Sequence, residues 1–61
     1  MTRKDYVLIA GAIAWSLDHH CDTILERHGA AETAREIARV LEQDNPRFDR
    51  ERFLKAAGVQ S

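Results

Sequence analysis

The last third of the chain, residues 44–59, contains the signals that most constrain its fold. Pro46 has no amide hydrogen and disfavours helical angles at Asn45, so a helix that precedes it must end near Asp44. Asp49 is a suitable N-cap for a new helix, because its carboxylate can accept a hydrogen bond from a free amide of the first turn. These residues predict one helix that ends, a turn of about five residues, and another helix that begins.

This last helix is predicted over about residues 50–57, with apolar partners at both ends. Phe48 and Phe53 have the spacing of a hydrophobic staple, in which the residue before the N-cap packs on the fourth helical residue. Gly58 can adopt the left-handed conformation that closes a helix, and Val59 can then pack back onto the last turn. A helix this short is marginal in water on its own, so we expect it to dock on the rest of the chain.

Two further helices are predicted before this segment. Thr2 and Asp5 have the spacing of a capping box, so the first helix is expected over about residues 3–28, with Gly29 as the residue that closes it. The second is expected over about residues 31–43, antiparallel to the first because the connection is short. All 61 residues are therefore expected to form a single helical domain, an all-α three-helix module with a long first helix and a helix-turn-helix-like C-terminal half.

The first helix is predicted to have an apolar stripe that faces the core along its whole length. At 100° per residue this stripe comprises Tyr6, Ile9, Ala10, Ile13, Leu17, His20, Cys21, Ile24 and His28. The second helix is expected to bury Ala34, Ile37, Ala38 and Leu41, with Val40 at the edge. On its exposed side, Glu32 with Arg35 and Glu36 with Arg39 have the spacing of ion pairs.

The opposite face of the first helix is also apolar in its first half. This surface, the Trp15 face, consists of Leu8, Gly11, Ala12 and Trp15. Two shorter helices cannot easily cover both sides of a long one, so we expect the Trp15 face to bind another protein chain. A second copy is the simplest partner, which would make a homodimer, and a host protein is the other. The alternative is that the third helix wraps round and buries the face within one chain.

The composition limits the classes of function. Ten acidic and nine basic residues give a formal net charge of −1, which provides no long-range attraction to nucleic acid or to an anionic membrane. A single cysteine, Cys21, excludes an intramolecular disulfide framework and fits a reducing compartment. The apolar run over residues 6–15 is too short to span a bilayer, and no cleavage site follows it. We therefore expect a cytoplasmic protein.

Residue types that bind metals cluster in the middle of the chain. On a continuous helix, His19, Asp22 and Glu26 would share one face, while His20 and Cys21 would point toward the core. Neither set is a compact group of three ligands, so we expect a solvated polar face and two partly buried side chains. No paired or activated constellation is present. We therefore expect no catalytic residue, no metal and no cofactor, and thus a protein that is not an enzyme.

A different function remains open for the basic residues around the third helix. These are Arg47, Arg50, Arg52 and Lys55, which a helix-turn-helix reader would place in or beside the major groove of DNA. Acidic residues are interleaved with them at Asp44, Asp49 and Glu51, which favours ion pairing within the protein. A small DNA- or RNA-binding regulator is therefore the alternative to a protein that acts through protein–protein interaction.

The segment from Asn45 to Gly58, NPRFDRERFLKAAG, and the opening from Met1 to Tyr6 resemble short uncharacterised proteins encoded by bacteriophages and prophages of actinobacteria. The similarity covers the two ends of the chain and not the middle. The group has no established activity, so no functional residue follows from the resemblance. It implies a small phage accessory protein that acts in the cytoplasm of a host bacterium.

Overall fold

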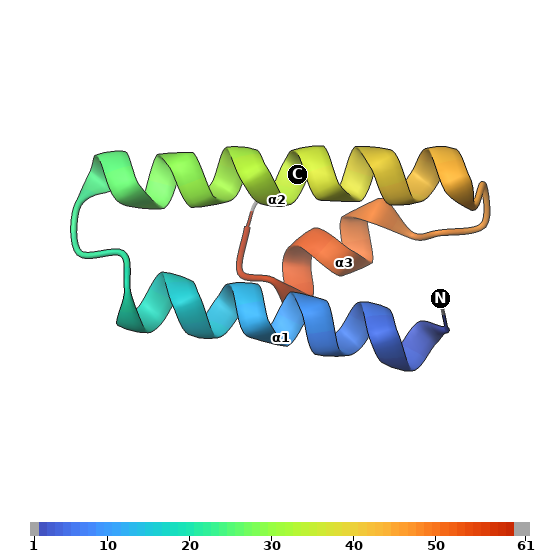
Figure 1. Cartoon of the computed structure of the whole chain (residues 1–61), viewed down its shortest axis with the longest axis horizontal. Helices are drawn as coiled ribbons and strands as arrows, with labels where there is room; N and C mark the ends of the chain where they lie inside the picture. The colour runs from blue at the N-terminus through green and yellow to red at the C-terminus, as the bar shows by residue number, and fades with distance from the viewer. Residues whose placement is uncertain (1, 60–61) are drawn as a thin grey trace.

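The computed structural model describes residues 2–59, which form three α-helices joined by two short connections (Figure 1). Helix α1 spans Arg3–His19, α2 spans Ile24–Asp44 and α3 spans Arg50–Ala56. Helices α1 and α2 run antiparallel, and α3 lies between them at the end where α1 begins and α2 ends. The described residues contain no strand, so the predicted all-α three-helix module is confirmed.

The predicted boundary between the first two helices is wrong. Helix α1 ends at His19 and not near His28, so α2, with 21 residues, is the longest helix and α1 has 17. The cause is a second capping box at the start of α2. The Thr23 amide donates to the Glu26 carboxylate at 3.0 Å, and the Glu26 amide donates to the Thr23 hydroxyl at 3.1 Å. These bonds satisfy free amides at the start of a new helix, so they favour the beginning of a separate helix at this point.

A contact across the connection satisfies the end of α1. The Arg27 guanidinium reaches back from the first turn of α2 and donates to the Leu17 carbonyl at 2.9 Å. That carbonyl lies in the last turn of α1, where carbonyl groups lack partners within the helix. The side chain of Arg27 thus ties the two helices together beside the turn.

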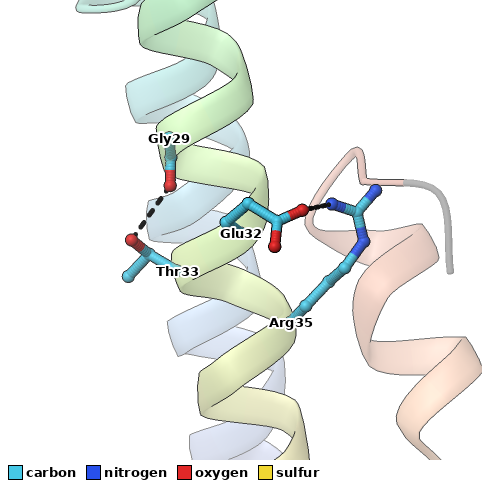
Figure 2. Close-up of polar contacts among 4 residues, drawn as sticks. All are labelled: Gly29, Glu32, Thr33 and Arg35. Carbon is cyan, nitrogen blue, oxygen red and sulfur yellow. Dashed lines mark hydrogen bonds and ion pairs between the residues drawn. The ribbon is translucent and has the colours of Figure 1, made fainter.

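Gly29 lies inside α2 and does not close a helix. Figure 2 shows the Thr33 hydroxyl donating to the Gly29 carbonyl, at 3.0 Å, as ordinary helix continues through the glycine. The same view shows the predicted ion pair between Glu32 and Arg35, with 2.6 Å between the charged atoms. Gly29 therefore behaves as a helix-interior glycine, which weakens the helix relative to alanine.

The two sides of α2 follow the predicted pattern. Ala34 and Ala38 are buried, with Ile37 and Leu41 partly buried beside them. On the exposed side, the Arg39 guanidinium donates to the Glu36 carboxylate at 2.9 Å. This hydrogen bond lowers the pKa of Glu36 and raises that of Arg39. Alanines on the buried side let the neighbouring helices approach closely.

The turn between α2 and α3 forms as the sequence predicts. Helix α2 ends at Asp44, and the Asp49 carboxylate accepts a hydrogen bond from the Arg52 amide at 3.0 Å. The rings of Phe48 and Phe53 lie 5.4 Å apart, which confirms the predicted staple.

The end of α3 is a Schellman motif. Gly58 has a φ of +79°, and its amide donates to the Lys55 carbonyl at 3.1 Å. The Val59 amide donates to the Leu54 carbonyl at 2.8 Å, and both of these side chains are buried. The two bonds satisfy the last carbonyls of the helix and turn the chain back toward the core.

Most of the large core side chains come from the C-terminal segment. The buried residues are Ala10 and Leu17 of α1, Ala34 and Ala38 of α2, and Phe48, Phe53, Leu54, Ala57 and Val59. The Tyr6 ring meets the Phe48 ring edge-on, with 4.6 Å between centroids. Helix α3 therefore packs on the first half of α1 and lies between the two longer helices.

The predicted core stripe of the first helix is correct up to Leu17 and also at Cys21, which is partly buried against the core. It is wrong for His20, Ile24 and His28, which are exposed. The reason is that α1 ends before residues 20–23, so Ile24 and His28 belong to α2 and do not continue the stripe of α1. A stripe calculated for one continuous helix does not extend past the end of that helix.

Candidate functional site

All four residues of the Trp15 face are exposed. Leu8 keeps 62% and Trp15 keeps 53% of the accessible area of the residue, while Gly11 and Ala12 lie exposed between them. Helix α3 lies on the other side of α1, among Tyr6, Ala10 and their neighbours. Within the described chain, therefore, α3 does not cover this face.

The side chain of Trp15 is held in place by two histidines. Its ring stacks on the His19 ring with 4.2 Å between centroids and 10° between planes, and the His20 ring meets it edge-on at 5.1 Å. A ring nitrogen of His19 also lies 2.9 Å from the Trp15 carbonyl, within hydrogen-bond distance. An exposed indole that is already ordered loses little further entropy when a partner covers it.

Packing within one chain does not explain the glycine on this face. A Cβ atom built on Gly11 would meet nothing within 4 Å among the described residues. Alanine would stabilise the helix by roughly 0.5–1 kcal/mol relative to glycine at such a position. A glycine here leaves room for the backbone of another helix to approach.

The structure separates the metal-ligand residue types that the sequence places together. His19 belongs to the last turn of α1, Asp22 to the connection and Glu26 to the first turn of α2. The Glu26 carboxylate accepts hydrogen bonds from the Asp22 amide, at 3.2 Å, and from the Thr23 amide. Hydrogen bonds with the hydroxyl and amide of Thr23 lower the pKa of Glu26. Over the described residues, no group of three or more such side chains could hold a metal ion.

The four basic residues around the third helix have different surroundings. Arg47 and Arg52 line a groove between α1 and α3, together with Arg3. Arg50 instead approaches Glu42 of α2, with 3.9 Å between the charged atoms, and Lys55 lies outside the groove. The approach of Glu42 to Arg50 reduces the positive charge that could bind a phosphate backbone.

We call this depression the arginine groove. It has a volume of about 390 Å³, and its apolar lining is Tyr6, Val7, Ala10, Phe48, Phe53 and Ala56. Its charged lining consists of Arg3, Arg47 and Arg52 with one carboxylate, that of Asp49. None of the three arginines forms an ion pair with another residue between positions 2 and 59. The groove therefore combines an apolar floor with unpaired positive charge.

The other end of the molecule has the opposite character. Ile24 and Leu25, the first residues of α2, keep 85% and 83% of their accessible area. Exposed acidic residues surround them in the sequence, at Asp18, Asp22 and Glu26. We call these five residues the hairpin tip.

Sequence reasoning missed the hairpin tip, because it assigned Ile24 to the core and placed Leu25 in the middle of a helix. The signal that reveals the tip is the capping-box pattern Thr23-x-x-Glu26. Arg3 was also missed as a groove residue, because its place beside Arg47 and Arg52 depends on where α3 docks.

No protein-family model, curated protein or solved structure matches this chain. No helix among residues 2–59 is long and apolar enough to cross a membrane.

Proposed function

We propose that this protein acts through protein–protein interaction rather than catalysis, and that it forms a homodimer through the Trp15 face. The observation that carries the proposal is the exposure of all four residues of that face on the side of α1 opposite α3. Contiguous exposed apolar side chains of this kind mark interaction sites on folded proteins.

A two-fold axis through the middle of the face suits its residues. Leu8 and Trp15 lie at either end, two turns apart, and Gly11 and Ala12 lie between them. In a symmetric pair the same patch contacts itself, so a large side chain of one copy can cover the small residues of the other. Burial of a tryptophan and a leucine in each copy contributes several kcal/mol at about 25 cal/mol per Å², before the cost of association is subtracted.

The decisive experiment measures mass in solution by light scattering over a hundredfold range of concentration. The parent protein is expected to shift from monomer to dimer, and Trp15→Ala is expected to stay a folded monomer throughout. Folding is checked by circular dichroism. A parent protein that is monomeric at every concentration contradicts the proposal.

A matched control separates the face from exposed apolar surface in general. Val40 of α2 is also about half exposed, at 49%, and lies on a different helix. Val40→Ala is expected to dimerise as the parent does. Equal weakening by Val40→Ala and Trp15→Ala would mean that association is non-specific.

Gly11→Ala gives a second test with two opposite expected effects. The added methyl group meets nothing in the monomer, so the monomer gains stability, by roughly 0.5–1 kcal/mol. The same methyl group lies where the second helix approaches, so the dimer weakens.

A partner other than a second copy, such as a host protein, would show the same dependence on Trp15.

A further inference from the structure

The two ends of the molecule differ in charge and in the exposure of their apolar side chains. The arginine groove is lined by three arginines and one aspartate, and the hairpin tip carries three acidic residues beside two almost fully exposed aliphatic ones. The described part of the chain leaves the arginines of the groove, and also Asp18 and Asp22 of the tip, without ion pairs. The groove therefore offers positive charge and an apolar depression, and the tip offers negative charge and exposed aliphatic side chains.

We propose that the hairpin tip of one molecule inserts into the arginine groove of a second copy. Ile24 and Leu25 would lie on the apolar floor formed by Tyr6, Phe48 and Phe53. A volume of about 390 Å³ is ample for an aliphatic side chain, since smaller apolar cavities in proteins admit benzene. Asp18 and Asp22 of the tip then face the arginines, and arginine binds carboxylates through two parallel hydrogen bonds.

A molecule cannot fill its own groove in this way. The tip lies at and beside the connection between α1 and α2, whereas the groove lies where α1 begins and α2 ends, at the far end of the long axis (Figure 1). That axis is 33 Å long. Contact between tip and groove therefore joins different copies head to tail, which produces an open chain or a closed ring.

This contact uses residues distinct from those of the Trp15 face, so the two proposals can fail separately. The test is made in the Trp15→Ala background, where dimerisation through that face is absent. Leu8→Glu is a second background in case Trp15→Ala does not fold, because Leu8 is exposed and outside the buried core.

Two variants are compared in this background, each with one end disabled. The tip variant carries Ile24→Ser and Leu25→Ser, and the groove variant carries Arg47→Glu and Arg52→Glu. Sedimentation is expected to show self-association at least about tenfold weaker for each variant alone than for the background protein. Mixed in equal amounts, the two are expected to form a one-to-one complex, because one supplies an intact groove and the other an intact tip.

Matched controls use residues outside both surfaces. Lys55→Glu changes an exposed charge beside the groove, and Val40→Ser removes an exposed apolar side chain from α2. Both are expected to self-associate as the background protein does. Because opposite charges meet in the contact, added salt is expected to weaken it.

Several results would overturn the inference. One is a mixture of the two variants that sediments as the sum of its parts. Another is a background protein that stays monomeric at millimolar concentration. A third is a groove that binds a short duplex DNA or a glutamate-rich peptide while the hairpin tip has no effect on the mass in solution.

Discussion

The hairpin tip, where α1 meets α2, and the C-terminal segment, residues 48–59, which contains α3, treat their apolar residues in opposite ways. Residues 48–59 bury Phe48, Phe53, Leu54 and Val59. The tip leaves Ile24 and Leu25 almost fully exposed. The difference is that α3 provides a third layer between α1 and α2 at one end, whereas at the tip only two helices meet. When only two helices pack together, each buries the side that faces the other. An apolar residue on any other side stays exposed unless a further element or molecule covers it.

The largest expected effect tests the buried member of this comparison. Leu54→Ala removes a side chain of α3 that is 2% exposed, and such truncations cost about 2–5 kcal/mol. A domain of this size rarely has more than a few kcal/mol of stability, so the variant is expected to be largely unfolded at 25 °C. Urea denaturation followed by circular dichroism measures the change.

The matched variant at the other end is Leu25→Ala, which is expected to change the stability of the monomer by less than about 0.5 kcal/mol. The measurement is made at low concentration, where association does not contribute. Similar losses for both variants would mean that the tip is packed in solution and would remove the contrast.

Two glycines provide a sharper comparison of the two regions. Gly58→Ala is expected to cost about 1–2 kcal/mol, because alanine is strained at a φ of +79°. Crowding adds little, since the new Cβ would lie 3.8 Å from the nearest atom of Leu17. Gly29→Ala is expected to have the opposite sign and to stabilise α2 by roughly 0.5–1 kcal/mol. Thermal unfolding midpoints that move in the same direction would contradict this assignment of the two glycines.

The capping box at the tip has a smaller expected effect. Thr23→Ala removes the hydroxyl that accepts from the Glu26 amide, and loss of such a cap costs about 1 kcal/mol. Thr23→Ser keeps the hydroxyl and is expected to restore most of the stability. If Thr23→Ala unfolds at the same urea concentration as the parent, the break between α1 and α2 does not depend on the cap.

The smallest expected effect is a dependence on pH shared by the two ends. The amide and hydroxyl of Thr2 lower the pKa of Asp5 below its ordinary 3.8. The hydroxyl and amide of Thr23, with the Asp22 amide, lower the pKa of Glu26 below its ordinary 4.5. A folded-state pKa below the unfolded value adds stability above the unfolded pKa. That stability is lost as the pH falls through the folded pKa, so stability should decline from about pH 5 downward.

Substitution separates the contributions of the two carboxylates. Glu26→Gln keeps an oxygen that can accept from the Thr23 amide but removes the titration, and Asp5→Asn does the same at the start of α1. Each is expected to make the decline with acid shallower in urea titrations at pH 3–6. An unchanged slope in both variants would assign the decline to other groups, such as Glu36, whose pKa is lowered by its hydrogen bond with Arg39.

The sequence alone determined the ends of helices wherever the signal is local. Pro46 and Asp49 fixed the turn before α3, and Gly58 fixed its end, because each acts on backbone angles or hydrogen bonds within a few residues. The break before α2 is just as local, in Thr23 and Glu26. It was missed because apolar residues continue at helical spacing through it, and a capping box does not interrupt that pattern the way proline does.

Only the tertiary structure decided which surfaces are left free. The Trp15 face could be predicted as apolar from α1 alone, but its exposure depends on the side of α1 to which α3 docks. The arginine groove combines Arg3 with Arg47 and Arg52, and both of these follow Arg3 by more than forty residues in the sequence. Periodicity describes one helix at a time. Both results depend on how three helices share one small core, where α3 fills the space at one end and leaves the tip uncovered.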